Sequence, residues 1–204
     1  RTQQTVADQP GSGFAGACVP VELGGIGVVS AHDMNTAAAR LAQGDASTSI
    51  GFAMPLVATW SMARRWAASP EPRPAEEFLR RAAKGELLFA AINSESGSDP
   101  RHPFTEATRA EGGWRVNGRK AFGTMSPAAD YYSCAVMAHD DEGKKRTGSI
   151  MVHRDTPGMR MDSNWDAFGM RASGSHDIVF ENCFVTDAAM TLGPAWGTLV
   201  PSAA

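Results

Sequence analysis

LFAAINSESGSD (Leu88–Asp99) and WRVNGRKAFGTMSPAAD (Trp114–Asp130) are the two stretches around which this sequence of 204 residues is organised. Each begins with residues that favour β-strands and ends with small and hydroxyl-bearing residues. Where a strand gives way to such a loop, backbone N–H groups and Ser or Thr oxygens are left free to face a ligand. The two stretches together predict a cofactor site.

The second stretch places Phe122, Thr124 and Ser126 two residues apart. At the period of a strand, this spacing predicts that one ring and two hydroxyls lie on the same side of the sheet. A flat heteroaromatic ring with polar atoms along one edge would suit them, and the small residues of Ser94–Asp99 could approach its edge or a phosphate. The alternative is that Ser94–Asp99 is only a hydrophilic turn and Phe122 a core residue.

The character of the sequence changes at Gly85, from Ala-rich helical periods to short runs of Val, Phe, Tyr and Ile separated by turn residues. Helices followed by strands predict an α+β protein, in which an α-helical domain precedes an all-β, barrel-like domain. We expect an N-terminal helical domain over residues 1–84, incomplete at its start, and a β domain with the ligand-contacting loops over residues 85–186. Residues 187–204 are expected to be a linker toward a missing C-terminal helical domain.

Three helices are expected in the first domain, at Ala31–Gln43, Ala46–Ala68 and Ala75–Ala83. Ser30 should cap the first of them. Pro55, within the second, should kink that helix or reset its first turn. Ile50, Phe52, Met54, Leu56, Val57, Trp60, Met62 and Trp66 make the second helix apolar around most of its circumference, which predicts neighbours on several sides.

Seven strands are expected in the second domain: Leu87–Asn93, Phe104–Ala110, Trp114–Phe122, Tyr131–Ala138, Gly148–His153, Met159–Met161 and Asp177–Val185. Glu111-Gly-Gly and Asn117-Gly118 are expected to be hairpin turns, because both central positions of a type I′ turn need a positive φ. The charged run from Asp140 to Arg146 is expected to be a solvated hairpin tip.

Four motifs occur in order: VPVELGGIG (Val19–Gly27), INSESGSD (Ile92–Asp99), W-x-VNGRKAFGT from Trp114, and GMRASGSHDIVFENCFV (Gly169–Val185). In this order they resemble P-E-x-x-G-G-x-G, T-E-P-G-x-G-S-D, W-x-[IL]-N-G-x-K-x-[WF]-I-T and G-x-R-x-S with [VI]-x-F-x-x-V-x-V-P. These are motifs of the flavoprotein family of acyl-CoA dehydrogenases. The resemblance runs from about Phe14 to Val185, nearly the whole chain.

The resemblance implies an enzyme that holds FAD and oxidises an acyl-CoA thioester to the 2,3-enoyl-CoA. Electrons would pass from the reduced flavin to an electron-accepting flavoprotein, and the protein would be a homodimer or homotetramer. Family members remove the α-proton with a glutamate of the C-terminal helical domain, so the catalytic base is expected beyond Ala204.

The resemblance also assigns ligand-binding residues. Thr124 matches the threonine whose hydroxyl faces flavin N5, and Phe122 matches the aromatic residue packed against the ring. The remaining cofactor contacts that it implies come from Ile92, Asn93, Ser94, Ser98 and Gly123. Ser98 and Arg171 match positions that would contact the substrate, although Arg171 could instead hold a buried carboxylate such as Asp166.

Two departures from the family motifs leave the chemistry open. The segment SESGSD (Ser94–Asp99), here called the serine loop, is two residues shorter than T-E-P-G-x-G-S-D and lacks its proline. Met125-Ser126-Pro127 replaces the usual Asn-Gly or Asn-Ala after the threonine. The second change could alter the flavin's potential or its access to oxygen. A flavin-dependent monooxygenase or oxidase on the same fold is therefore one alternative. A non-catalytic acyl-CoA-binding protein that has lost the C-terminal domain is another.

Composition restricts the partners. The net charge of −3 without a basic run argues against nucleic acid, and no apolar run is long enough to span a membrane. Three widely spaced cysteines give no complete disulfide framework, which favours a cytoplasmic protein.

The five histidines lack ligand spacing, so no metal is expected. Glu95 and Asp99 are expected to accept backbone hydrogen bonds in a turn.

Overall fold

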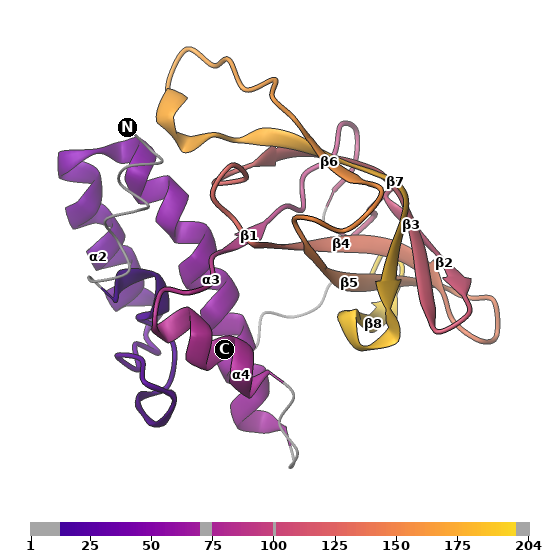
Figure 1. Cartoon of the computed structure of the whole chain (residues 1–204), viewed down its shortest axis with the longest axis horizontal. Helices are drawn as coiled ribbons and strands as arrows, with labels where there is room; N and C mark the ends of the chain where they lie inside the picture. Colours follow the sequence, from indigo (N-terminus) through magenta and orange to yellow (C-terminus); the bar gives the residue numbers. More distant parts are fainter. Residues whose placement is uncertain (1–12, 70–74, 100, 199–204) are drawn as a thin grey trace. The chain divides into compact units, whose positions relative to one another are not determined.

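The computed structural model describes residues 13–69, 75–99 and 101–198. The chain divides into two compact units that alternate along the sequence. The helical unit contains Arg1–Ala91, Thr124–Asp130 and Trp165–Gly174, and the sheet unit contains Ile92–Gly123, Tyr131–Asn164 and Ser175–Ala204. The helical unit thus extends past Gly85 and takes in two segments that are distant in sequence. The α+β fold class is confirmed (Figure 1).

The helical unit is built on α2 (Ala31–Gly44), α3 (Ala46–Ala68) and α4 (Glu76–Ala83), with the 3₁₀ turns η2 (Phe14–Gly16) and η3 (Val21–Leu23), the strand β1 (Phe89–Ala91) and the 3₁₀ turn η4 (Arg171–Ser173). Ser30 caps α2 as expected, because its hydroxyl accepts a hydrogen bond from the Asp33 amide at 3.3 Å. Asp45 caps α3 in the same way through the Ser47 amide at 3.0 Å. The three helices predicted from the sequence are therefore confirmed.

Helix α3 runs from Ala46 to Ala68 with Pro55 inside it, so the proline does not reset the helix start. Phe52, Leu56 and Trp66 on this helix are buried, whereas Ile50 and Val57 remain 40% and 48% exposed. The helix is therefore apolar on more sides than the described part of the helical unit covers.

The sheet unit contains β2 (Glu106–Ala110), β3 (Gly113–Gly123), β4 (Tyr131–His139), β5 (Lys145–His153), β6 (Met159–Asp162), β7 (His176–Thr186) and β8 (Met190–Ala195), with the 3₁₀ turn η5 (Asp187–Ala189) before β8. Their order in the sheet is β6-β7-β3-β2-β4-β5-β8. Neighbours are antiparallel except β2 and β4, which are parallel. Burial alternates along β4, where Tyr132, Cys134, Val136 and Ala138 face the core.

The expectation that residues 187–204 form only a linker is wrong for the part that the structure describes, because β8 lies within it. Gly193 and Pro194 hid this strand from the sequence pattern. The strand lies at the end of the sheet order, where a proline without an N–H is tolerated. Residues 199–204 lie outside the described part of the chain, as do residues 1–12.

The prediction of a hairpin turn at Asn117-Gly118 is also wrong. Strand β3 continues through both residues, and its register against β7 shifts between Val116 and Gly118, as it does at a β-bulge. The Asn117 side chain accepts a hydrogen bond from the Asn182 amide at 2.7 Å. A Cβ on Gly118 would lie 2.6 Å from the Thr105 hydroxyl, so the glycine serves close packing rather than a turn. The turn at Glu111 and Gly112 is confirmed.

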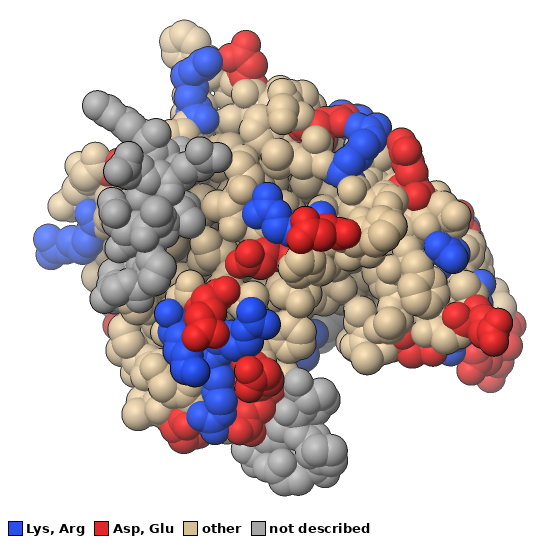
Figure 2. Space-filling view, viewed as in Figure 1, with Lys and Arg blue, Asp and Glu red and all other residues tan. Residues whose placement is uncertain are grey.

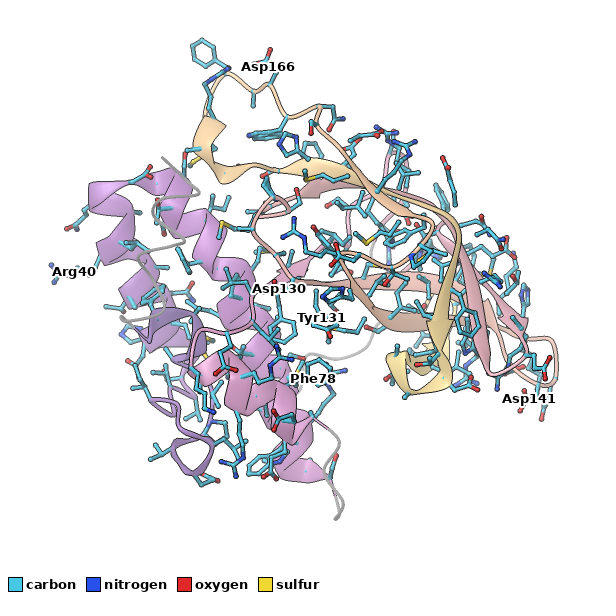
Figure 3. All side chains as sticks on the ribbon, viewed as in Figure 1. Arg40, Phe78, Asp130, Tyr131, Asp141 and Asp166 are labelled. Atoms are coloured by element: carbon cyan, nitrogen blue, oxygen red, sulfur yellow. The ribbon has the colours of Figure 1, made fainter. Side chains whose placement is uncertain are left out.

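The charged run after β4 is the expected hairpin tip between β4 and β5, and Asp141 lies at its outer end (Figure 3). The Asp140 carboxylate accepts hydrogen bonds from the Glu142 and Lys144 amides, which lowers its pKa. On the face shown in Figure 2, acidic and basic side chains lie interspersed rather than gathered by sign. No helix in the described ranges is long and apolar enough to cross a membrane.

Candidate functional site

In the sheet unit, the serine loop lies against the end of β3. The Ala121 amide donates a hydrogen bond to the Ser94 carbonyl at 2.8 Å, and the two residues form an isolated antiparallel bridge. Gly123 leaves no space for a side chain, because a Cβ there would lie 2.6 Å from the His176 carbonyl oxygen and 3.2 Å from Cγ2 of Ile92. The two stretches that the sequence singled out therefore meet at Ser94 and Ala121.

Phe122 does not sit in the core. Its side chain is 62% exposed, and its φ of 56° lies in the left-handed region that aromatic residues rarely adopt. The prediction that Phe122, Thr124 and Ser126 share one side of a strand is wrong, because β3 ends at Gly123 and Met125 also has a positive φ of 66°. Thr124 and Ser126 are buried, whereas Phe122 faces solvent.

The serine loop is fixed by a buried carboxylate. Glu95 Oε1 accepts hydrogen bonds from Lys120 Nζ at 2.5 Å and from the Thr105 hydroxyl at 2.5 Å. The Thr105 and Phe104 amides donate to the same carboxylate at 2.8 and 2.5 Å. Lys120 is fully buried, and Nζ also donates to the Ala135 carbonyl at 2.5 Å.

These contacts set the charge state of Glu95. Burial alone would raise its pKa, but the hydrogen bonds from Lys120, Thr105 and the Phe104 amide outweigh burial and lower it. Asp99 also has a lowered pKa, because Arg101 and His102 donate to it. Both acids accept backbone hydrogen bonds, as the sequence predicted.

Sequence reasoning did not assign a role to Lys120. A signal was present, since Lys120 shares the strand period of two with Trp114 and Val116, which predicts a buried lysine, and SESGSD offers an acid that could pair with it.

Other predicted cofactor residues of the sheet unit are partly engaged within the protein. The Ile92 amide donates to the Ser133 carbonyl at 2.9 Å, so this amide is not available to a ligand. The Asn93 side-chain oxygen accepts from the Ala135 amide at 2.9 Å. Ser94 is exposed, and Ser98 is half-buried with its amide 3.4 Å from the Glu95 carbonyl. Asn93 and Ser94 are thus the exposed residues of this group.

In the helical unit, the residues after Gly123 pack against the segment that contains Arg171. The Met125 amide donates to the Ser173 carbonyl at 2.9 Å, and the Ser126 hydroxyl donates to the Gly174 carbonyl at 3.0 Å. Met125 is buried in a cluster with Ala15 and Phe52. The replacement for the family's Asn-Gly is therefore part of the core of this unit.

Arg171 itself is exposed and pairs with a carboxylate. Its guanidinium donates to Asp166 Oδ1 at 2.8 Å and to the Ala167 carbonyl at 2.9 Å. Asp166 is 83% exposed, so the expected partner is correct but is not buried. Figure 3 places Asp166 on an outer loop of the chain.

The cysteines and acids of the described segments suggest no other chemistry. Burial raises the pKa of Cys18 and Cys183 to about 11 and that of Cys134 to about 12, which keeps these thiols protonated and unreactive. No cluster of three His, Cys, Asp or Glu residues suited to a metal ion is found within the described ranges.

The sheet unit exposes two groups that suit a flat heteroaromatic ring. Such a ligand needs a flat apolar surface to pack on and polar groups at its edge. Phe122 presents an exposed ring, and Ser94 presents an exposed hydroxyl on the segment that is bonded to the neighbouring Ala121. The resemblance to the acyl-CoA dehydrogenases implies flavin contacts at both residues.

Comparison with known proteins gives the same class. Residues 89–183 match the family model of the acyl-CoA dehydrogenase middle domain. The chain belongs to the acyl-CoA dehydrogenase family.

Individual relatives differ in their chemistry. The chain is 36% identical over 185 residues to L-evernosamine nitrososynthase of Micromonospora sp., a match that covers 89% of this chain and 43% of the relative. It is 34% identical over 180 residues to YdbM of Bacillus subtilis, which is provisionally named an acyl-CoA dehydrogenase, and covers 86% and 45% of the two chains.

A solved structure of KijD3 in complex with FMN and dTDP-3-amino-2,3,6-trideoxy-4-keto-3-methyl-D-glucose superposes with a TM-score of 0.86 at 31% identity. The match covers 95% of this chain and 47% of that chain. The present chain therefore spans less than half the length of these relatives.

Proposed function

We propose that the whole protein is a flavin-dependent monooxygenase that oxidises the amino group of an amino sugar. The observation that carries this proposal is the similarity, over 89% of the chain, to a nitrososynthase. The fold is also shared with KijD3, whose solved structure contains an amino-sugar nucleotide. The two departures from the acyl-CoA dehydrogenase motifs support it. The serine loop is short, and Met125 is built into the core where the family has a polar residue.

The residues that would hold the flavin are those of the two strand ends. Phe122 would pack against the ring, and Ser94 would donate to its edge. The resemblance to the family assigns the hydroxyl at N5 to Thr124. A bound reduced flavin would supply two electrons to oxygen, so that one oxygen atom joins the substrate nitrogen as a hydroxylamine and the other leaves as water. The protein's share is to orient the ring and exclude water.

Acyl-CoA dehydrogenation with FAD remains the second candidate. It is favoured by the family model over residues 89–183 and by the similarity to YdbM. In that case Ser98 and Arg171 would contact the acyl-CoA, a carboxylate beyond Ala204 would take the α-proton, and a partner flavoprotein would accept the electrons. A symmetric homo-oligomer is part of both proposals, since Ile50 and Val57 on α3 remain exposed in the chain alone.

One experiment on the full-length protein separates the two functions. The flavin is released and identified as FMN or FAD, and the reconstituted protein is then mixed anaerobically with a panel of acyl-CoA thioesters. Separately, the chemically reduced protein is mixed with oxygen and a nucleotide-linked amino sugar. The proposal expects no bleaching by any thioester and a product heavier by one oxygen atom. Bleaching by a thioester, with no oxygenated product, would establish the dehydrogenase instead.

A further inference from the structure

Lys120 and Glu95 form a buried ion pair in the sheet unit, on the two segments that carry Ser94 and Phe122. The Lys120 side chain is 0% exposed and that of Glu95 is 4% exposed, with 2.5 Å between Nζ and Oε1. Removing two charges from water is expensive, and a well-packed apolar pair of similar volume is often at least as stable. Stability alone is therefore a weak reason for this pair.

The pair instead connects segments that must keep a fixed spacing. Glu95 belongs to the serine loop and Lys120 to β3. The carboxylate also binds the Phe104 and Thr105 amides at the entrance to β2, and the ammonium binds the Ala135 carbonyl on β4. Apolar contacts would hold these segments together without fixing their register, whereas charged hydrogen bonds have defined directions.

The residues next to the pair are those proposed to meet the flavin. Ser94 adjoins Glu95, and Phe122 lies two residues after Lys120. Between them, the Ala121 amide bonds to the Ser94 carbonyl at 2.8 Å. Phe122 also keeps a φ of 56°, a conformation that persists only where the surroundings enforce it. The ion pair and the Ser94–Ala121 bridge hold the two residues before Phe122, Lys120 and Ala121, against the loop.

We propose that Lys120 and Glu95 are a positioning pair that sets Ser94 against Phe122 and so orients the flavin ring on the sheet unit. This inference rests on the proposed flavin-dependent function. Neither residue is assigned a contact with the flavin; both act through the loop and the strand that carry Ser94 and Phe122.

The test uses the full-length protein, with FMN and FAD as the probes. Lys120→Met, Glu95→Gln and the double variant are compared with the wild type in thermal unfolding, in flavin affinity and in the visible spectrum of the bound flavin. Each single variant should lose stability and at least tenfold in flavin affinity. The double variant, which buries no charge, should recover most of the stability but remain at least tenfold weaker in affinity, with an altered spectrum.

Two further variants sharpen the result. Arg119→Gln, beside Lys120, removes the ion pairs of a half-exposed guanidinium with Asp162 and Asp177 and should leave flavin affinity unchanged. Thr105→Val removes one hydroxyl donor to Glu95 in a variant that keeps both charges, and should weaken flavin binding about threefold to tenfold, the effect of a hydrogen bond of ordinary strength.

A double variant that regains both stability and wild-type affinity would show that the pair only stabilises the fold and would overturn the inference, as would unchanged affinity in Thr105→Val and both single variants. Failure of the wild-type protein to bind either flavin is a separate outcome, which would overturn the proposed function and this inference with it.

Discussion

The segment Thr124–Asp130 in the helical unit and the loop Ser94–Asp99 in the sheet unit both carry candidate ligand residues, but they are held by different forces. The first is held by backbone hydrogen bonds to Ser173 and Leu88 and by the packing of Met125 on Phe52. The second is held by a buried carboxylate with its lysine partner. Apolar packing tolerates replacement by side chains of similar volume, whereas the loss of one partner of a buried ion pair strongly destabilises the fold.

The largest effect is expected for Lys120→Met. Removing the ammonium leaves Glu95 buried without its charged partner, which should lower the free energy of unfolding by about 3–5 kcal/mol at neutral pH. Urea unfolding monitored by tryptophan fluorescence measures this loss. Adding Glu95→Gln should return much of it, because the two residues are directly coupled.

The loss should also depend on pH. In the wild type the folded-state pKa of Glu95 is lowered, so its stabilising contribution is present above the unfolded-state pKa and is lost as pH falls through the folded-state pKa. Without Lys120, burial dominates and the pKa of Glu95 rises. The difference between wild type and Lys120→Met should therefore shrink from pH 7 to pH 4. A difference that stays constant over this range would show that Glu95 is not the group left unpaired.

Met125→Ala tests the apolar side of the comparison. The side chain is 2% exposed and contacts the cluster of Ala15 and Phe52, so its removal should cost about 2–5 kcal/mol through a cavity. Thermal unfolding measures the loss. Met125→Leu conserves volume and should cost less than about 1.5 kcal/mol. Equal losses in the two variants would point to the backbone conformation, rather than packing, as the main contribution of this residue.

Prediction from the sequence succeeds where a feature depends on neighbouring residues and fails where it depends on distant ones. Helix ends such as Ser30 and Asp45 were predictable because a cap depends on residues a few positions away. The Asn117-Gly118 turn was wrong because β7, far along the chain, pairs with β3 and turns the local signal into a bulge.

The candidate site divides in the same way. The motifs indicated the serine loop and the end of β3, but they did not show that Phe122 leaves the strand alternation or that Lys120 pairs with Glu95. The pairing joins residues that are 25 apart in the sequence, so the strand alternation can indicate that Lys120 is buried but cannot identify its partner.

Thr124→Ala is expected to act on chemistry more than on the fold. If its hydroxyl donates to flavin N5, losing it should weaken stabilisation of the reduced ring by about 1–3 kcal/mol and lower the flavin potential. Spectroelectrochemical titration of the full-length protein measures the potential. Thr59→Ala is a matched control, because this buried hydroxyl donates within α3 to the Pro55 carbonyl at 2.8 Å and should change stability alone. An unchanged potential in Thr124→Ala would remove Thr124 from the flavin site.

The smallest expected change in stability is an increase, in Phe122→Gly. A non-glycine residue in the left-handed region costs about 1–2 kcal/mol, and glycine removes that cost while adding about 0.5–1 kcal/mol of chain entropy to the unfolded state. With a φ of 56° and a largely exposed ring, Phe122 should therefore give a variant that is at most about 1.5 kcal/mol more stable.

The same variant should bind flavin more weakly, because it lacks the exposed ring that is proposed to pack against the flavin. Asn182→Gly is the control, since Asn182 has a φ of 52° on β7 and is not among the proposed ligand residues. It should change stability less, because asparagine tolerates this conformation, and should leave flavin affinity unchanged. A Phe122→Gly protein that is more stable and binds flavin as tightly as the wild type would show that the strain at Phe122 serves something other than the ring.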